Sequence, residues 1–248
     1  MCESDHSIKM LGIRWKCIGD FFFYLVSHVS EDQVTELVAG KVVTKRQMLS
    51  DIAKVFDPVG WLIPVTLKLK LMIQSVWLQG LEWDAALPQD IAQSFFTWRG
   101  QLTDLREVKI TRLICSDFTS TTNQLHVFCD ASQTSYAACI YLRTVSKENG
   151  QVTVSLITAK SKVAPIKQLT MPRLELCAAV LGAKLLQAVT KALAKLDLTC
   201  EIFGWTDATI VLNWLSEVPR QWNVFVSNRV NKVQHVIPQA RWLHVRAL

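Results

Sequence analysis

The order of apolar patterns in the second half of the chain constrains its fold more than any other feature. Three short strand-like segments come first, then a long apolar helical pattern, a fourth strand, two helical stretches and a last strand. These segments are 125–129, 137–144, 152–159, 172–196, 200–207, 208–217, 222–236 and 241–245. The turn KENGQ joins the second and third strands, and Pro172 falls in the first turn of the long helix. This order predicts an α/β (α+β) fold with a mixed five-stranded sheet and flanking helices.

The first half of the chain shows a different pattern. Two strands joined by a turn at Cys17 to Asp20 predict a hairpin with no partner strands before it. Helical patterns follow at 44–57, 59–83 and 88–105, with Thr44 as the expected N-cap and Pro64 in a first turn. We therefore expect three parts, 1–40, 41–107 and 108–248. Because both ends cut through strand-like segments, we expect a fragment of a longer protein.

Charge and cysteine usage narrow the class of protein. The net charge of +6 and the pI near 9.0 favour an anionic partner, nucleic acid first. The seven cysteines form no C-x-x-C and the five histidines are scattered, which argues against a disulfide framework or a zinc site. The start MCESDHSIKM is not a signal peptide, and Lys68 and Lys70 interrupt an apolar stretch. We expect an intracellular chain with no membrane partner.

Three acidic residues occupy positions that one edge of a sheet can bring together. Asp130 ends the first strand of the sheet, Glu175 lies one turn into the long helix, and Asp207 ends CEIFGWTD just before a helix. Converging carboxylates repel one another unless cations lie between them, as paired Mg²⁺ ions do in phosphodiester hydrolysis. Each acid also has a structural explanation: a helix cap at Asp207, a turn at Asp130, or a favourable helix-dipole charge at Glu175. Their order along the strands and helices favours the metal site.

Basic residues near these segments form a second candidate set, for binding nucleic acid. Lys160 and Lys162 belong to the third strand region, Arg173 opens the long helix, and Arg220 and Trp222 combine a cation with an aromatic ring. Such side chains can hold phosphates and stack beside sugars, but an ordinary solvated surface with a core tryptophan explains them as well. The tryptophans on apolar helix faces are expected in the core: Trp61, Trp77, Trp83 and Trp98.

Several motifs resemble the Pol polyprotein of Bel/Pao-type LTR retrotransposons. FCDAS, LTMPRLELCAAVLGAKL and GWTDATIVLNWL, in that order, resemble its ribonuclease H domain. The sequence TKRQMLSDIAKVFDPVGWLIPVTLKLKLMIQSVWLQGLEWD resembles the preceding segment, known as the Pao retrotransposon peptidase region, and KMLGIRW resembles the end of the reverse transcriptase palm. The resemblance implies a palm hairpin in 1–40, a thumb- or connection-like helical subdomain in 41–107, and a ribonuclease H-like domain in 108–248 that is truncated at its C-terminus.

The resemblance also implies a site and a reaction. Asp130, Glu175 and Asp207 match the first three metal-binding catalytic carboxylates of the ribonuclease H site, which uses two Mg²⁺ or Mn²⁺ ions. The fourth acid is expected in an N-P-A-D-like motif after RWLHV, and the sequence stops at Leu248 without it. The implied activity is hydrolysis of the RNA strand of RNA–DNA hybrids during reverse transcription, with the hybrid and the rest of Pol as partners.

Other activities of such an element are not expected in this chain. It contains neither the Asp-Asp pair of a polymerase nor the D-[ST]-G motif of an aspartic peptidase. The alternative to a nuclease is a non-catalytic nucleic-acid-binding relic or domesticated module that lacks the fourth carboxylate. In either case we expect a cytoplasmic location, within a virus-like particle in an intact element, or a nuclear one, and not secretion.

Overall fold

The computed structural model describes residues 7–10, 13–24, 42–115 and 117–246. By contacts the chain divides into a first unit, Met1–Pro58 with Pro64–Ile114, and a second unit, Val59–Ile63 with Cys115–Leu248. The short segment Val59–Ile63 belongs to the second unit because Val59 O accepts hydrogen bonds from Ala159 N and Thr158 Oγ1, both at 2.8 Å. The first unit extends to Ile114, past residue 108, where the sequence pattern predicts that the last domain begins.

Four short antiparallel strands form the sheet of the first unit, in the order β1-β2-β3-β4. They are β1 (Ser7–Met10), β2 (Ile13–Lys16), β3 (Phe21–Tyr24) and β4 (Lys109–Thr111). The predicted hairpin is confirmed as β2 and β3, and Gly19 and Asp20 in its turn have positive φ angles of 93° and 48°. The expectation that no partner strand precedes the hairpin is wrong, because β1 pairs with β2. On the other side β4, distant in sequence, pairs with β3.

The helices of the first unit follow the predicted order with shifted ends. They are α2 (Lys45–Ala53), α3 (Ile63–Leu78), α4 (Gln89–Gln101) and the 3₁₀ helix η1 (Leu102–Glu107). Thr44 is the N-cap of α2 as predicted, since its side chain accepts a hydrogen bond from Gln47 N at 3.3 Å. Trp98, 2% exposed, donates from Nε1 to Val65 O at 3.2 Å and so ties α4 to α3.

Two tryptophans predicted to lie in the core are instead largely exposed. Trp77 is 51% exposed and Trp83 is 43% exposed, and their rings meet edge to face with centroids 5.7 Å apart. Lys45 lies against them, with Nζ 3.6 Å from the Trp77 ring centroid and 2.9 Å from Leu81 O. Because Lys45 is only 4% exposed, the rings serve to cover a buried ammonium group rather than to fill the apolar core.

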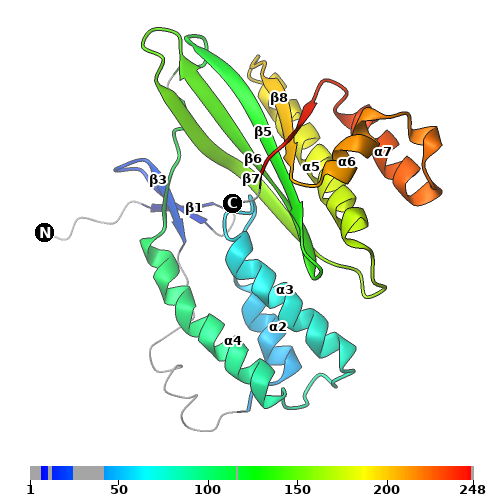
Figure 1. The fold of residues 1–248 in the computed structure, drawn as a ribbon. Coiled ribbons are helices and arrows are strands. Elements are labelled where there is room, and N and C mark those ends of the chain that lie inside the picture. The colour runs from blue at the N-terminus through cyan, green and yellow to red at the C-terminus, as the bar shows by residue number, and fades with distance from the viewer. Residues whose placement is uncertain (1–6, 11–12, 25–41, 116, 247–248) are drawn as a thin grey trace, which may run out of the picture. The chain divides into compact units, whose positions relative to one another are not determined.

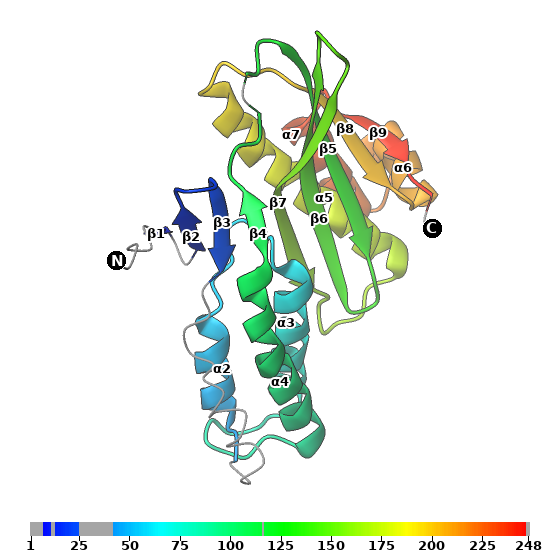
Figure 2. The same cartoon turned by 90° about the vertical axis from the view of Figure 1, so that its left-hand side faces the viewer.

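The second unit contains the predicted mixed sheet of five strands, in the order β7-β6-β5-β8-β9. Its elements are β5 (Thr121–Ala131), β6 (Ser135–Ser146), β7 (Val152–Val163), α5 (Met171–Ala194), β8 (Glu201–Thr206), α6 (Thr209–Ser216), η2 (Pro219–Gln221), α7 (Val224–Val236) and β9 (Arg241–His244). β5, β6 and β7 are antiparallel neighbours, whereas β8 pairs in parallel with both β5 and β9. Figures 1 and 2 show α5, α6 and α7 on one face of this sheet.

Helix α5 forms the core of the second unit against β5 and β6. Leu125 and Val127 alternate with half-buried residues along β5, which gives the strand one buried face under the helix. Gly182 allows the close approach, because a Cβ there would lie 2.5 Å from Cys129 Sγ and 2.9 Å from Val127 Cγ2. By length and composition α5 is apolar enough to cross a membrane, but here its apolar face packs on the sheet.

Candidate metal centre

Three elements of the second unit bring Asp130, Glu175 and Asp207 together. Asp130 stands near the end of β5, and Asp207 directly follows β8. Because β5 and β8 are parallel neighbours, their carboxyl ends meet at the same edge of the sheet. Helix α5 crosses β5 and places Glu175 over this edge. Each residue offers one carboxylate oxygen, and the three oxygens all lie within 4.8 Å of one another.

Helix capping does not explain Asp207. The N-cap of α6 is Ala208, and no side-chain hydrogen bond caps this helix. The local hydrogen bond comes from the neighbouring residue instead, since Thr206 Oγ1 accepts from Ala208 N at 3.2 Å. Asp207 is exposed at the end of β8, where its carboxylate is available to a ligand.

The tight turn after β5 does not need Asp130 either. Asp130 is still within the sheet, opposite Ala137 of β6. Ser132 closes the turn, donating from its backbone N to Ser135 O at 2.7 Å. The Asp130 carboxylate accepts a hydrogen bond from Ala131 N at 2.7 Å, which orients it at the edge of the sheet. This backbone donor carries no residue-type signal, so sequence reasoning missed it.

Glu175 is the buried member of the group. It is 8% exposed. An acid that the helix dipole stabilises lies in the first turn of the helix, and Glu175 lies beyond the first turn of α5. Burial first, and then the charges of Asp130 and Asp207, raise the pKa of Glu175 from its ordinary 4.5 to about 7. A hydrogen bond from the Ala131 backbone acts in the opposite direction. A charged Glu175 is therefore costly in this position unless a cation compensates it.

The donor set fits a divalent cation. Glu175 Oε2 is buried without a hydrogen-bond partner among the residues that the structure describes, although buried carboxylate oxygens are normally paired. Two exposed carboxylates lie beside it, so the centre is open to solvent on one side. Magnesium prefers a few carboxylate oxygens and retains waters for a substrate to replace. The arrangement is compatible with the ribonuclease H type of metal site.

The predicted nucleic-acid contacts lie on several elements of the second unit. Lys160 and Lys162 are exposed on β7. Arg173 stacks on the Phe225 ring, 4.9 Å from its centroid, and so links α5 to α7. Arg220 is exposed in η2. The Trp222 ring packs edge to face against Trp214 with centroids 6.4 Å apart, which gives it a structural contact.

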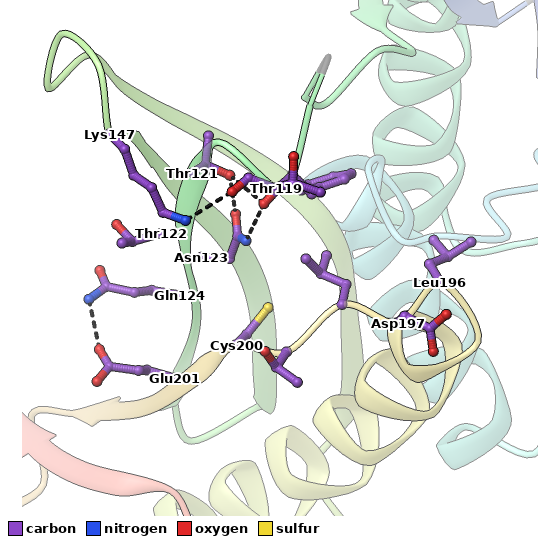
Figure 3. A pocket seen from close by; sticks show the side chains of 13 residues that line it. Thr119, Thr121, Thr122, Asn123, Gln124, Lys147, Leu196, Asp197, Cys200 and Glu201 are labelled. Carbon is purple, nitrogen blue, oxygen red and sulfur yellow. Dashed lines mark hydrogen bonds between the residues drawn. The ribbon is translucent and has the colours of Figure 1, made fainter.

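A separate cleft lies at the opposite end of β5. Figure 3 shows it between the start of β5 and the segment that joins α5 to β8. Its volume is about 900 Å³. Its polar groups already bond one another: Lys147 Nζ donates to Thr119 O at 2.9 Å and Gln124 Nε2 to Glu201 Oε2 at 3.2 Å. The cleft contains none of the three clustered acids, which lie at the other end of the sheet.

Comparison with known families agrees with this arrangement. Residues 44–208, more than half of the 248-residue chain, match the family described as the Pao retrotransposon-like RNaseH-like domain. The chain belongs to this family. The match covers the helices of the first unit and continues through β5, α5 and β8 to Asp207, so it includes all three carboxylates. The predicted Pao resemblance is thereby confirmed. No curated protein matches the chain.

Solved structures show where the Pao fold recurs. A foamy viral protease-reverse transcriptase, in a form called dRH and in complex with double-stranded DNA, covers 98% of the chain with a TM-score of 0.52 and 14% identity. A second foamy viral protease-reverse transcriptase with double-stranded DNA also covers 98%, with a TM-score of 0.52 and 12% identity. The Pao chain spans only 38% and 45% of these two proteins.

A smaller protein resembles part of the chain. LC11-RNase H1 in complex with an RNA/DNA hybrid covers 49% of the Pao chain, with 13% identity and a TM-score of 0.34, and 85% of that protein is matched. At these identities the likeness concerns the fold alone.

Proposed function

We propose that this Pao domain hydrolyses the RNA strand of RNA–DNA hybrids during reverse transcription, with divalent metal held by Asp130, Glu175 and Asp207. One observation carries the proposal. Acids from three separate elements converge within 4.8 Å, and one of them, Glu175, keeps a buried oxygen without a partner in the described structure. A fold that served only as a scaffold would gain nothing from this arrangement, since it raises the pKa of Glu175 and so opposes its ionisation.

The residues of the chain take distinct parts in this reaction. When bound, Mg²⁺ would neutralise the carboxylates and favour in-line attack of water on a phosphodiester. Glu175 would hold the metal from the buried side, because it is the buried member of the cluster and its Oε2 has no hydrogen-bond partner in the described structure. Asp130, oriented by Ala131 N, and Asp207, at the end of β8, would supply ligands from the exposed side, which a hybrid can reach. The net charge of +6 favours the approach of the polyanion.

The natural setting is part of the same proposal. We propose a role within the Pol polyprotein of an intact element, which the family assignment supports. A location in the cytoplasm or the nucleus is a further part of this proposal.

Cleavage of a labelled RNA–DNA hybrid by the 248-residue chain, with Mg²⁺ or Mn²⁺, tests the proposal. Asp130→Asn should abolish cleavage and weaken metal binding, because the amide keeps the shape and removes the charge. Glu148→Gln, an exposed acid in the turn between β6 and β7, is the matched control and should cleave like the parent. Hybrid binding without any cleavage by the parent chain would instead support the non-catalytic binding module.

A further inference from the structure

One flank of the second unit carries basic residues that no acid balances. Lys160 and Lys162 on β7, Lys184 on α5 and Lys232 on α7 are all exposed. Strand β7 and helix α7 contain no aspartate or glutamate, and the single acid of α5 is the buried Glu175 of the metal centre. The three elements therefore present positive charge to solvent without local compensation.

Strand register and helix packing place these lysines on one flank. Lys160 pairs with Ala138, and Ala138 lies directly under α5, since a Cβ on Gly182 would be 3.4 Å from Ala138 Cβ. Because cross-strand partners share a face of the sheet, Lys160 points to the side that α5 covers. Lys162 lies on the same side of β7, and Lys184 follows Gly182 along α5.

Helix α7 completes the cluster by packing along α5. Figure 1 shows these two helices next to each other on one side of the sheet. Lys232 on α7 lies near enough to Lys184 for the positive charges of the two ammonium groups to repel each other. The charge of Lys232, followed by burial and then the charges of Lys162 and Lys160, lowers the pKa of Lys184. Juxtaposed donors of like charge become favourable when an anion with several acceptor oxygens lies between them.

The position of the cluster relative to the metal centre suggests which anion it binds. Asp130, Ala137 and Ser161 form one row across β5, β6 and β7, and Lys160 and Lys162 stand on either side of Ser161. Two strand spacings separate this row's ends, which is roughly 10 Å. By the same cross-strand rule Asp130 and Ser161 face away from α5, whereas the two lysines face the side of α5, the helix that carries Glu175 of the metal centre. A nucleic-acid backbone that reaches the metal centre from the α5 side thus has further phosphates within range of the lysines.

We propose that Lys184 and Lys232, with Lys160 and Lys162, form a phosphate-binding surface that holds the backbone of a bound nucleic acid beside the metal centre. The choice of nucleic acid over other polyanions as the ligand of this surface rests on the proposed nuclease function. The surface is expected to recognise the charge and shape of the backbone rather than the base sequence, since lysines present point charges and none of these elements offers a base-reading motif.

Equilibrium binding of a fluorescent RNA–DNA hybrid to the full chain, in EDTA and over a range of salt concentrations, tests this surface. The variant is Lys184→Gln with Lys232→Gln. The control is Lys191→Gln with Lys195→Gln, which removes the same charge from exposed positions at the far end of α5. The double variant should bind about tenfold more weakly at low salt, and its slope of log K against log salt should fall by about 2, because two phosphate contacts are lost.

The outcomes separate this surface from the proposed reaction. Equal affinity and slope in the two variants, with thermal denaturation showing both folded, would overturn the phosphate-binding surface even if the parent cleaves hybrid. If the chain binds hybrid through these lysines but never cleaves it, the proposed nuclease function is wrong and the phosphate-binding surface is supported. Loss of binding to phosphatidylserine vesicles, with hybrid binding unchanged, would assign the lysines to a membrane and contradict the proposal.

Discussion

Asp130 and Glu175 place carboxylate oxygens within 4.8 Å of each other at the edge of the sheet, although Glu175 is 8% exposed. Two such groups are difficult to ionise together without a cation, and this has consequences for the metal-free chain that can be measured.

Replacing Glu175 with glutamine should stabilise the metal-free chain at alkaline pH. The folded pKa of about 7 lies above the ordinary 4.5, so between these values the folded state binds more protons than the unfolded state. Stability is therefore lost as pH rises through this window, and the loss is complete above pH 7. Glu175→Gln should avoid a loss of up to about 3 kcal/mol at pH 8 and have little effect at pH 4. Urea unfolding at several pH values measures this, and a parallel fall in both proteins would contradict it.

Mg²⁺ should stabilise the parent chain but not a variant that lacks the buried ligand. An ion that binds only the folded state raises the free energy of unfolding by RT ln(1 + [L]/Kd), which is about 2.7 kcal/mol at an ion concentration of 100 Kd. Thermal melts with and without Mg²⁺ at pH 8 should show a rise for the parent and for Glu148→Gln, and none for Glu175→Gln. An equal rise in all three would mean that the ion binds elsewhere.

Adding a methyl group at Gly182 should disturb the packing of α5 on the sheet. The new Cβ would lie 2.5 Å from Cys129 Sγ, so Gly182→Ala should cost about 1–3 kcal/mol despite the better helix propensity of alanine. Cys129→Ala removes the closest atom, and the double variant should therefore be more stable than the sum of the two single effects. Chemical denaturation of the four proteins measures this coupling, and simple additivity would argue against the predicted clash.

The ammonium group of Lys45 should contribute to the stability of the first unit. Lys45→Met keeps the aliphatic stem but loses the contact with the Trp77 ring at 3.6 Å and the hydrogen bond to Leu81 O. A loss of about 1–3 kcal/mol is expected, with a change in tryptophan fluorescence. Lys68→Met, at an exposed position on α3, is the control and should change stability little. Similar unfolding midpoints for both variants would show that the cation adds nothing.

Local sequence determined most of the elements that position the metal centre. The alternation around Leu125 and the uninterrupted apolar pattern after Pro172 are properties of neighbouring residues, so β5 and α5 were predictable, although β5 begins earlier than expected. The motif order also predicted which acids gather at the sheet edge. Thr44 was recognisable as a cap because capping depends on residues within one turn.

Tertiary structure decided what depends on distant partners. The pairing of β4 with β3, the exposure of Trp77 over Lys45, and the approach of Lys232 to Lys184 all join residues far apart in the chain, and no local pattern specifies them. The same holds for the charge state of Glu175. Its residue type makes it a candidate ligand, but only the folding of β5 and β8 beside α5 buries it between two acids and raises its pKa.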